Sequence, residues 1–191
     1  YQNEKLGLSN GSGLMLLFDQ KTGKNVALLS DEAYLTDVRT AVAGAICAEQ
    51  FANEIHCIGV IGTGLQARMQ VEYLKKITVC RKVMVWGRNS KKSKEYSSYM
   101  MKLGFEVKIC DSPKYITDSC NLIITTTAAT EPILFTDDIQ PGTHITAMGS
   151  DTPAKQELDS NILGKADCVI ADSISQCIER GEISHALKDG K

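Results

Sequence analysis

The chain has 191 residues, of which 43% are hydrophobic and 23% are charged. Such a chain suits one globular domain, or one domain and part of a second, and its composition excludes a disordered or fibrous protein. The formal net charge of −2 offers no basic surface to nucleic acid or to an anionic membrane, so we expect neither as a partner.

The seven cysteines are odd in number and lie mostly within apolar runs. No Cys-x-x-Cys pair or Cys/His cluster offers ligands for zinc, so we expect reduced core cysteines and no metal site. No signal peptide opens the chain, and no apolar run approaches the roughly 18 residues of a membrane span. These features together predict a cytoplasmic protein.

Strand and helix patterns succeed one another along the chain. Apolar runs at 14–18 and 26–29 flank a turn-like segment and predict a β-hairpin, and Ala-rich helical spacing then predicts a helix through Ala52 with Thr36 as its N-cap. Beyond residue 53 we expect strands at 56–61, 82–86, 106–109, 122–127, 144–148 and 168–171, and helices at 65–77 and 90–103. This alternation is typical of an α/β fold of the Rossmann type, with a doubly wound, mostly parallel sheet.

A glycine-rich segment, CIGVIGTGLQARMQ, spans the end of the first of these strands and the start of the next helix. Gly62, Gly64 and Ala67 form the pattern G-x-G-x-x-A, in which the first glycine permits a tight turn and the second lets the backbone approach a pyrophosphate. The small third residue lets helix and strand pack closely, and the helix N-terminus offers free N–H groups to phosphates. We interpret the segment as a dinucleotide-binding loop; the alternative is a glycine turn that binds no ligand.

The acid that usually binds the ribose 2′-hydroxyl of NAD is missing about 20 residues after Ala67, where the chain has Gly87. Basic and polar side chains gather there instead, at the start of the next helix. They are Arg88, Asn89, Ser90, Lys91, Lys92 and Lys94. Because the helix dipole disfavours cations at this end, the cluster favours a bound anion, such as the 2′-phosphate of NADP. The alternative is an exposed basic helix face.

Two charged residues are candidates for handling a substrate. Asp151 follows the strand at 144–148 and should lie at the carboxyl edge of the sheet, where a partly desolvated carboxyl could exchange a proton with a nitrogen. Arg39 lies in a helix start that is otherwise small and apolar, and its guanidinium could hold a substrate carboxylate. The alternatives are a turn cap for Asp151 and a surface ion pair with Asp31 or Asp37 for Arg39.

Five segments taken together carry a resemblance to a known family. They are LTDVRTAVAGAICA, IGVIGTGLQARMQ, VMVWGRN, ITAMGSDTPAKQELD and VIADSISQCIERGEISHAL, in this order along nearly the whole chain. The chain thereby resembles the ornithine cyclodeaminase/mu-crystallin family. The resemblance implies a homodimer in which residues 1–53 are part of a substrate-binding and dimerisation domain with its connecting helix, and residues 54–191 form the NAD(P)-binding Rossmann domain.

The resemblance also implies roles for individual residues. Arg39 would bind the substrate carboxylate, and Asp151 would be the acid/base residue that contacts the substrate amine or imine. The implied cofactor contacts are Asn10, Leu65, Gln66, Thr127, Met148, Gly149 and Lys155, with the last three on the nicotinamide side. The family's active-site lysine and a further substrate-binding arginine would lie upstream of Tyr1, so we expect the chain to be a piece of a longer enzyme.

Two departures from the family pattern bear on the reaction. The NAD-using cyclodeaminases carry an aspartate in place of Gly87 and a second glycine in place of Ser150. We therefore expect an NAD(P)-dependent oxidoreductase, with NADP favoured, that reduces or oxidises the C–N bond of a small imino or amino acid. The alternatives are ammonia-releasing cyclisation of a diamino acid, as in ornithine cyclodeaminase, and a crystallin-like protein that binds NADP without turnover.

Overall fold

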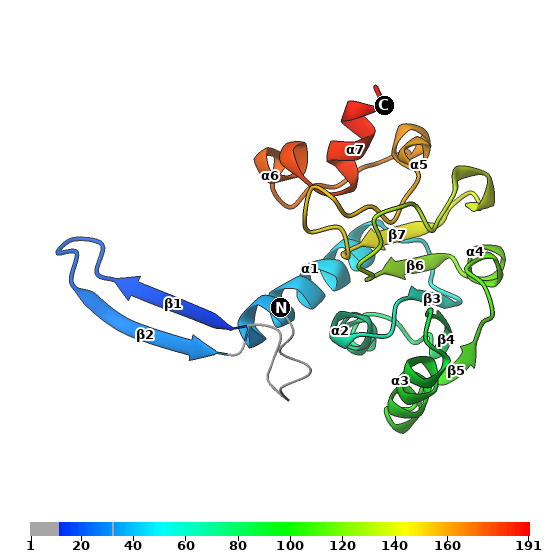
Figure 1. Cartoon of the computed structure of the whole chain (residues 1–191). Coiled ribbons are helices and arrows are strands. Elements are labelled where there is room, and N and C mark those ends of the chain that lie inside the picture. The colour runs from blue at the N-terminus through cyan, green and yellow to red at the C-terminus, as the bar shows by residue number, and fades with distance from the viewer. Residues whose placement is uncertain (1–11, 32) are drawn as a thin grey trace.

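A five-stranded sheet covered by helices forms the main body of the protein, and a two-stranded hairpin extends from that body (Figure 1). The structure, a computed structural model, describes residues 12–31 and 33–191. The hairpin consists of β1 (Gly13–Phe18) and β2 (Asn25–Asp31), and α1 (Tyr34–Phe51) connects it to the sheet. The hairpin predicted from the two apolar runs is therefore present.

Strands and helices alternate after α1, and every strand pairing in the main sheet is parallel. In chain order the elements are β3 (Ile58–Ile61), α2 (Leu65–Leu74), β4 (Lys82–Trp86), α3 (Ser90–Lys102), β5 (Glu106–Ile109), α4 (Lys114–Ser119), β6 (Leu122–Thr125), the short 3-10 helix η2 (Thr136–Asp138), β7 (His144–Ala147), α5 (Ser160–Lys165), α6 (Ile174–Glu179) and α7 (Glu182–Lys188). The strand order is β5-β4-β3-β6-β7. The predicted doubly wound parallel sheet is confirmed.

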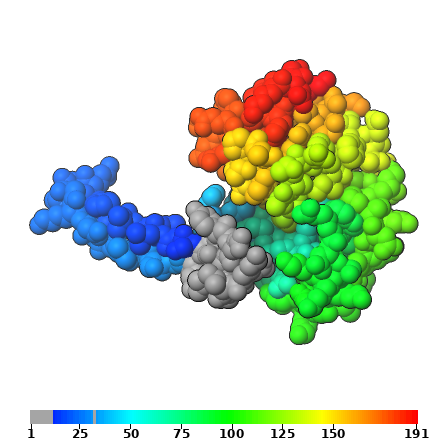
Figure 2. Space-filling model, in the orientation of Figure 1, coloured from blue at the N-terminus to red at the C-terminus, as the bar shows by residue number. Residues whose placement is uncertain are grey.

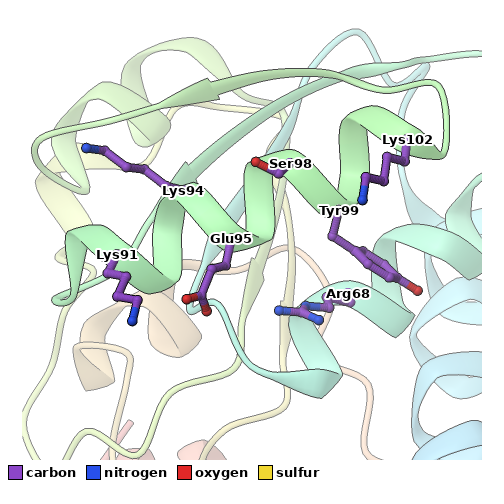
Figure 3. A pocket seen from close by; sticks show the side chains of 7 residues that line it. All are labelled: Arg68, Lys91, Lys94, Glu95, Ser98, Tyr99 and Lys102. Carbon is purple, nitrogen blue, oxygen red and sulfur yellow. The ribbon is translucent and has the colours of Figure 1, made fainter.

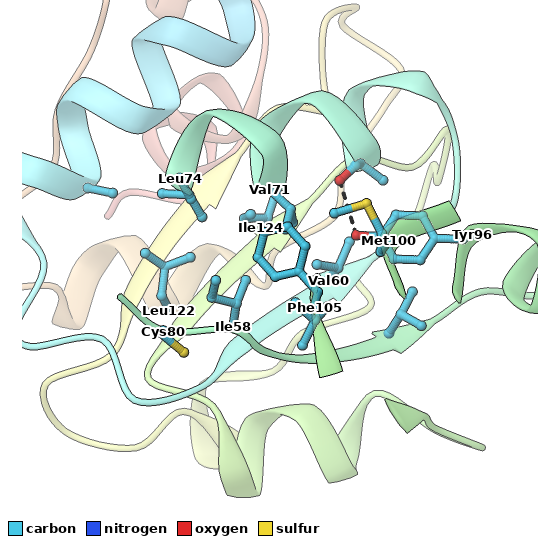
Figure 4. Close-up of a cluster of buried hydrophobic side chains, with 14 residues drawn as sticks. Ile58, Val60, Val71, Leu74, Cys80, Tyr96, Met100, Phe105, Leu122 and Ile124 are labelled. Atoms are coloured by element: carbon cyan, nitrogen blue, oxygen red, sulfur yellow. Dashed lines mark hydrogen bonds between the residues drawn. The ribbon is translucent and has the colours of Figure 1, made fainter. Parts of the chain in front are cut away.

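Apolar side chains are buried on both faces of the sheet, as expected where a parallel sheet carries helices on each side. On one face Ile58 and Val60 lie in a core cluster that also takes in Tyr96 and Met100 of α3 (Figure 4). The Tyr96 hydroxyl donates a hydrogen bond to the backbone oxygen of Ala67 at 3.3 Å, which ties α3 to α2. The second cluster, on the other face, includes Ile61, Ile116, Ile123 and Ile162.

The parallel strands end level with one another. In the hydrogen-bond register Ile61 of β3 pairs with Trp86 of β4 and with Thr125 of β6, and Thr125 pairs with Ala147 of β7. The loops that follow these four strands therefore leave the sheet at the same edge. In a doubly wound sheet this carboxyl edge is the place where ligands bind.

The hairpin stands away from the main body (Figure 2) and leaves apolar side chains in solvent. The exposed large hydrophobic residues of its two strands are Leu14, Met15, Leu16, Leu17, Phe18, Val26, Leu28 and Leu29. A two-stranded hairpin is at best marginally stable by itself in water. A contiguous apolar surface of this kind is typical of a site that packs against another protein surface.

The sequence prediction is wrong at two elements. Thr36 is not the N-cap of α1, because the helix begins at Tyr34 and the Asp31 carboxylate accepts the N–H of Leu35 at 2.7 Å. Residues 168–171 form no strand and instead run between α5 and α6, with the side chains of Val169 and Ile170 about half exposed. An apolar run of four residues has too little periodicity to distinguish a strand from a surface segment.

The other expected elements are present, and they differ only at their ends. Helix α2, for example, ends at Leu74 rather than at residue 77. The domain boundary predicted after residue 53 falls just beyond the end of α1, and it stays a prediction. Within residues 12–31 and 33–191, no helix is long and apolar enough to span a membrane.

Candidate functional site

A cleft of about 540 Å³ opens at the carboxyl edge of the sheet. Its walls are the loops that follow β3, β4 and β6, contributed by residues 62, 63, 86–89, 92 and 126–133. Strand β3 lies between β4 and β6, so the order of the strands reverses beside it. The cleft is therefore at the position where doubly wound folds bind ligands.

Gly62 is required by the fold itself. Its φ of 120° lies in a region that favours glycine, and a Cβ added there would lie 2.6 Å from Thr126 Oγ1 and 2.8 Å from the Thr126 carbonyl oxygen. The Gly62 N–H donates to the carbonyl oxygen of Trp86 at 2.9 Å. This glycine therefore lets the loops after β3, β4 and β6 approach one another.

Gly64, by contrast, is not required by the fold. Its φ of −79° suits any residue, and a Cβ added there would meet no atom within 4 Å. It is the N-cap of α2, whose first N–H groups, including those of Leu65 and Gln66, receive no side-chain cap. An open approach to unpaired helix N–H groups fits the pyrophosphate of a dinucleotide.

Two further residues of the loop are held by their neighbours. Ala67 is fully buried beneath the Tyr96 hydroxyl, so the predicted close packing of helix and sheet is present. The Gln66 side-chain amide donates to the backbone oxygen of Asp37 at 3.1 Å and to its carboxylate at 2.9 Å. The Gln66 side chain therefore ties α2 to α1, and only its backbone N–H remains for a phosphate.

The ribose end of the cleft has no room for an acid at position 87. A Cβ on Gly87 would lie 2.8 Å from Thr63 Cγ2 and 3.2 Å from Ser93 Oγ. Arg88 is exposed and lines the cleft, whereas the Asn89 side chain caps α3 by accepting the N–H groups of Lys91 and Lys92 at 3.0 and 3.1 Å. Ser90, the first residue of α3, is exposed.

The basic residues at the start of α3 separate into two groups. Arg88 and Lys92 line the cleft, but Lys91 and Lys94 line a different groove on the outer side of α2 and α3 (Figure 3). In that groove the Arg68 guanidinium lies 4.8 Å from the ring centre of Tyr99. The groove is not at the ends of the strands, so we consider the cleft the candidate site for a dinucleotide.

The loop after β7 brings Asp151 and Lys155 together at the carboxyl edge. The Lys155 ammonium lies 2.6 Å from an Asp151 carboxylate oxygen, and the Ser150 hydroxyl donates to the Lys155 backbone oxygen at 2.5 Å. The Asp151 side chain is 68% exposed in this structure, and its role in proton transfer stays a prediction. As expected, Asp151 follows the end of β7, and it lies in an exposed loop there.

A buried carboxylate that the sequence analysis missed lies behind this loop. Glu157 is fully buried and accepts the N–H of Thr127 at 2.5 Å and the N–H of Gly149 at 2.9 Å. Burial raises the pKa of Glu157, and hydrogen bonds from Thr127 and Gly149 oppose that rise. In sequence the residue lies in a polar stretch, KQELD, which carries no signal that distinguishes it from a solvated surface acid.

Three further residues were predicted to contact the cofactor: Met148, Thr127 and Asn10. The Met148 N–H donates to the Thr125 backbone oxygen at 2.9 Å, and the Thr127 hydroxyl accepts the N–H of Ala129 at 3.2 Å. Asn10 lies outside the described residues.

Arg39 is exposed on α1 and has no ion-pair partner within residues 12–31 and 33–191. The alternative of a surface pair with Asp31 or Asp37 is therefore not observed. Its stretch of α1 is held against α2, because Gln70 of α2 donates to the Thr40 backbone oxygen at 3.1 Å. No described interaction joins Arg39 to Asp151, so the two substrate-handling candidates remain separate predictions.

Most of the cysteines lie in the interior or are half-buried. Cys57, Cys80, Cys110 and Cys120 are buried, and all seven cysteines are free thiols. The part of the chain that the structure describes contains no group of three or more His, Cys, Asp or Glu side chains that could hold a metal ion.

Comparisons with known proteins give the chain a family. The family model described as "Ornithine cyclodeaminase/mu-crystallin family" matches residues 1–191. An uncharacterised cyclodeaminase of Sinorhizobium fredii (strain NBRC 101917 / NGR234) is 36% identical over 192 residues, and the match covers 100% of this chain and 58% of that protein.

Solved structures with similar folds include the following two. An archaeal alanine dehydrogenase, described as a dimer with bound NAD, has a TM-score of 0.90 and 33% identity over 98% of this chain and 58% of that one. The Δ1-pyrroline-2-carboxylate reductase of Thermococcus litoralis, in complex with NADH and L-proline, has a TM-score of 0.90 and 32% identity over 99% of this chain and 59% of that one. The chain thus spans less than two thirds of the length of these relatives. By the match along its whole length, this chain belongs to the ornithine cyclodeaminase/mu-crystallin family.

Proposed function

We propose that the protein is an NAD(P)-dependent oxidoreductase that reduces the C=N bond of a small imino acid or oxidises the corresponding amino acid. The observation that carries the proposal is Gly64, a glycine that the fold does not need, which faces open space at the N-terminus of α2. The similar archaeal and Thermococcus structures are described with NAD and with NADH. A dinucleotide pyrophosphate at this loop explains why no side chain is present there.

Three residues of the chain would bind the substrate and transfer its proton. When bound, the nicotinamide supplies or accepts the hydride. Arg39 would hold the substrate carboxylate through its guanidinium, and Asp151 would pass a proton to or from the substrate nitrogen. Lys155 would hold the Asp151 carboxylate in place through the ion pair at 2.6 Å.

The preferred cofactor that we propose is NADP. Without a side chain at position 87 there is no carboxylate to bind the ribose 2′-hydroxyl or to repel a 2′-phosphate. Arg88 and Lys92 line the same end of the cleft and carry the positive charge that a 2′-phosphate needs. The Asn89 side chain caps α3, so Asn89 would contribute to this site by holding the start of that helix.

We also propose a homodimer in the cytoplasm. A second copy would cover the exposed apolar side chains of the hairpin, and the archaeal alanine dehydrogenase is described as a dimer. A reducing compartment suits the seven free cysteines.

Gly64→Ala should separate cofactor binding from folding. The added methyl meets no protein atom, so we expect the melting temperature to change by less than about 2 °C while dinucleotide affinity, measured by calorimetry, falls at least about tenfold. Gly62→Ala is the matched control and should lower the melting temperature by several degrees, because the backbone there has a φ of 120°. A Gly64→Ala variant with unchanged affinity would contradict a pyrophosphate at this loop.

Asp151→Asn tests the proton-transfer role in the full-length protein. We expect kcat for imine reduction to fall by about 10²–10⁴-fold with little change in cofactor affinity, because the amide cannot exchange the proton. Asp167→Asn makes the same change at an exposed position between α5 and α6, and it is the control. An unchanged kcat would reduce Asp151 to the partner of Lys155, and ammonia release without net cofactor consumption would favour the cyclodeaminase reaction instead.

Arg88→Ala tests the cofactor preference. In the wild type NADPH should bind at least about tenfold more tightly than NADH, and the variant should lose this difference while its NADH affinity stays the same, since only the 2′-phosphate contact is removed. Lys94→Ala, in the outer groove, should change neither affinity. Tighter binding of NADH by the wild type would be evidence against the phosphate site.

Leu28→Lys tests the dimer. Leu28 is 59% exposed and pairs with Leu16 in the hairpin, so a charge there should prevent a second copy from covering the strands. Light scattering should give a dimer for the wild type and a monomer for the variant. Gln20→Lys, at the polar hairpin turn, should remain a dimer. A monomeric wild type would refute the proposal.

A further inference from the structure

The buried Glu157 carboxylate joins the loop that follows β6 to the loop that follows β7. One of its oxygens accepts the N–H of Thr127, which follows β6, and the other accepts the N–H of Gly149, which follows β7. Glu157 forms no ion pair with any residue in the described ranges. The Glu157 side chain therefore holds the two loops to each other.

The backbone that carries Glu157 is itself fixed on both sides. Its carbonyl oxygen accepts the N–H groups of Ile133 and Leu134 at 2.7 and 3.1 Å, within the segment after β6. On the other side the buried Glu182 carboxylate, at the start of α7, accepts the N–H groups of Glu157 and Leu158 at 2.8 and 3.1 Å. The Glu157 side chain thus extends from a segment that has little freedom to move.

The absence of a side chain at Gly149 makes room for this carboxylate. A Cβ at Gly149 would lie 2.5 Å from Glu157 Cδ and would also collide with the Thr127 carbonyl oxygen. Because no side chain intervenes, the Gly149 N–H can reach the buried oxygen directly. The glycine before Ser150 and Asp151 is therefore explained by the contact with Glu157.

Burial makes this arrangement costly. Burial raises the pKa of Glu157 and of Glu182. At Glu157 the side chains of Thr127 and Thr125 oppose the rise together with the N–H groups of Thr127 and Gly149, and at Glu182 backbone N–H groups oppose it. An apolar residue of similar size would avoid the cost but could accept neither N–H group. A carboxylate at position 157 is thus specifically suited to hold two donors at once.

The two loops lie on one half of the sheet. In a doubly wound fold the adenosine half of a dinucleotide lies over the side of β3 and β4, and the nicotinamide half lies over the opposite side of the switch point. Here that opposite side is formed by β6 and β7. Thr127 and Gly149 lie there, and Asp151 follows Gly149 by two residues.

We propose that Glu157 is a positioning residue that fixes the loops after β6 and β7 against the nicotinamide half of the cofactor. This inference rests on the proposed function. Glu157 is fully buried and is not among the residues that line the cleft, so it would act through the backbone of Thr127 and Gly149. The adenosine half, held by the loops after β3 and β4, should not depend on it.

Two variants in the full-length protein test the proposal. Glu157→Gln keeps the length of the side chain but has only one acceptor oxygen, and Glu157→Asp keeps two oxygens but is one methylene too short to reach both loops. Glu106→Gln, at an exposed position on β5, is the control. The probes are ADP-ribose with NADH and 2′-phospho-ADP-ribose with NADPH, and the pair that the wild type binds more tightly is used.

For both variants we expect the Kd of the dinucleotide to rise about tenfold or more and kcat to fall, while the Kd of the adenosine-half probe stays within about twofold. Retained probe binding also shows that the variant has folded. If neither variant folds, Glu182→Gln should give the same pattern more weakly, because it loosens the segment that carries Glu157.

Three results would overturn the inference. Unchanged dinucleotide affinity and kcat would show that the loops need no clamp, and equal losses for both probes would show a general structural role. A wild type that binds neither probe would overturn the proposed function, and the inference with it.

Discussion

The hydrogen-bond register of the parallel sheet is the constraint on which the candidate site depends. Because Ile61, Trp86, Thr125 and Ala147 end their strands at one level, the loops that follow them surround a common space. A shift of one strand would move its loop out of the cleft and turn its apolar side chains to the opposite face. The two core clusters, one on each face, therefore stabilise the strand register, and with it the position of the loops that form the site.

The two halves of this edge are built in different ways. On the side of β3 and β4 the backbone is open, with Gly64 facing empty space and Arg88 exposed. On the side of β6 and β7 the backbone is fastened to buried carboxylates, since Glu157 accepts from two loops and Glu182 accepts from the segment that carries Glu157. An open half suits a phosphate that binds to N–H groups, whereas a fastened half suits a reaction that needs fixed geometry.

Much of the fold could be predicted because its signals are local. The strand before Gly62, the G-x-G-x-x-A loop and the alternation of strands and helices depend on residues close in sequence, and the structure contains all three. The start of α1 was missed because its cap comes from Asp31, and a Thr within the helix resembles a cap equally well. The run at 168–171 was too short to identify a strand.

The candidate site was less predictable because its key contacts join distant segments. Glu157 meets Thr127 across 30 residues and is itself held by Glu182 across 25, and nothing in a polar sequence stretch indicates such burial. The basic residues before and within α3 looked like one cluster, but the helix turns some of them to the cleft and others to the outer groove. The pairing of Asp151 with Lys155 likewise depends on the conformation of a surface turn.

Trp86 provides the most direct measurement of whether a dinucleotide enters the cleft. It is the only tryptophan in the chain, it ends β4, and it lines the cleft. Titration of the protein with NADPH and with NADH should give saturable quenching of its fluorescence with energy transfer to the reduced nicotinamide, and ADP-ribose or its 2′-phosphate should reverse the energy transfer. Fluorescence that does not change with either dinucleotide would contradict a cofactor site at the carboxyl edge of this sheet.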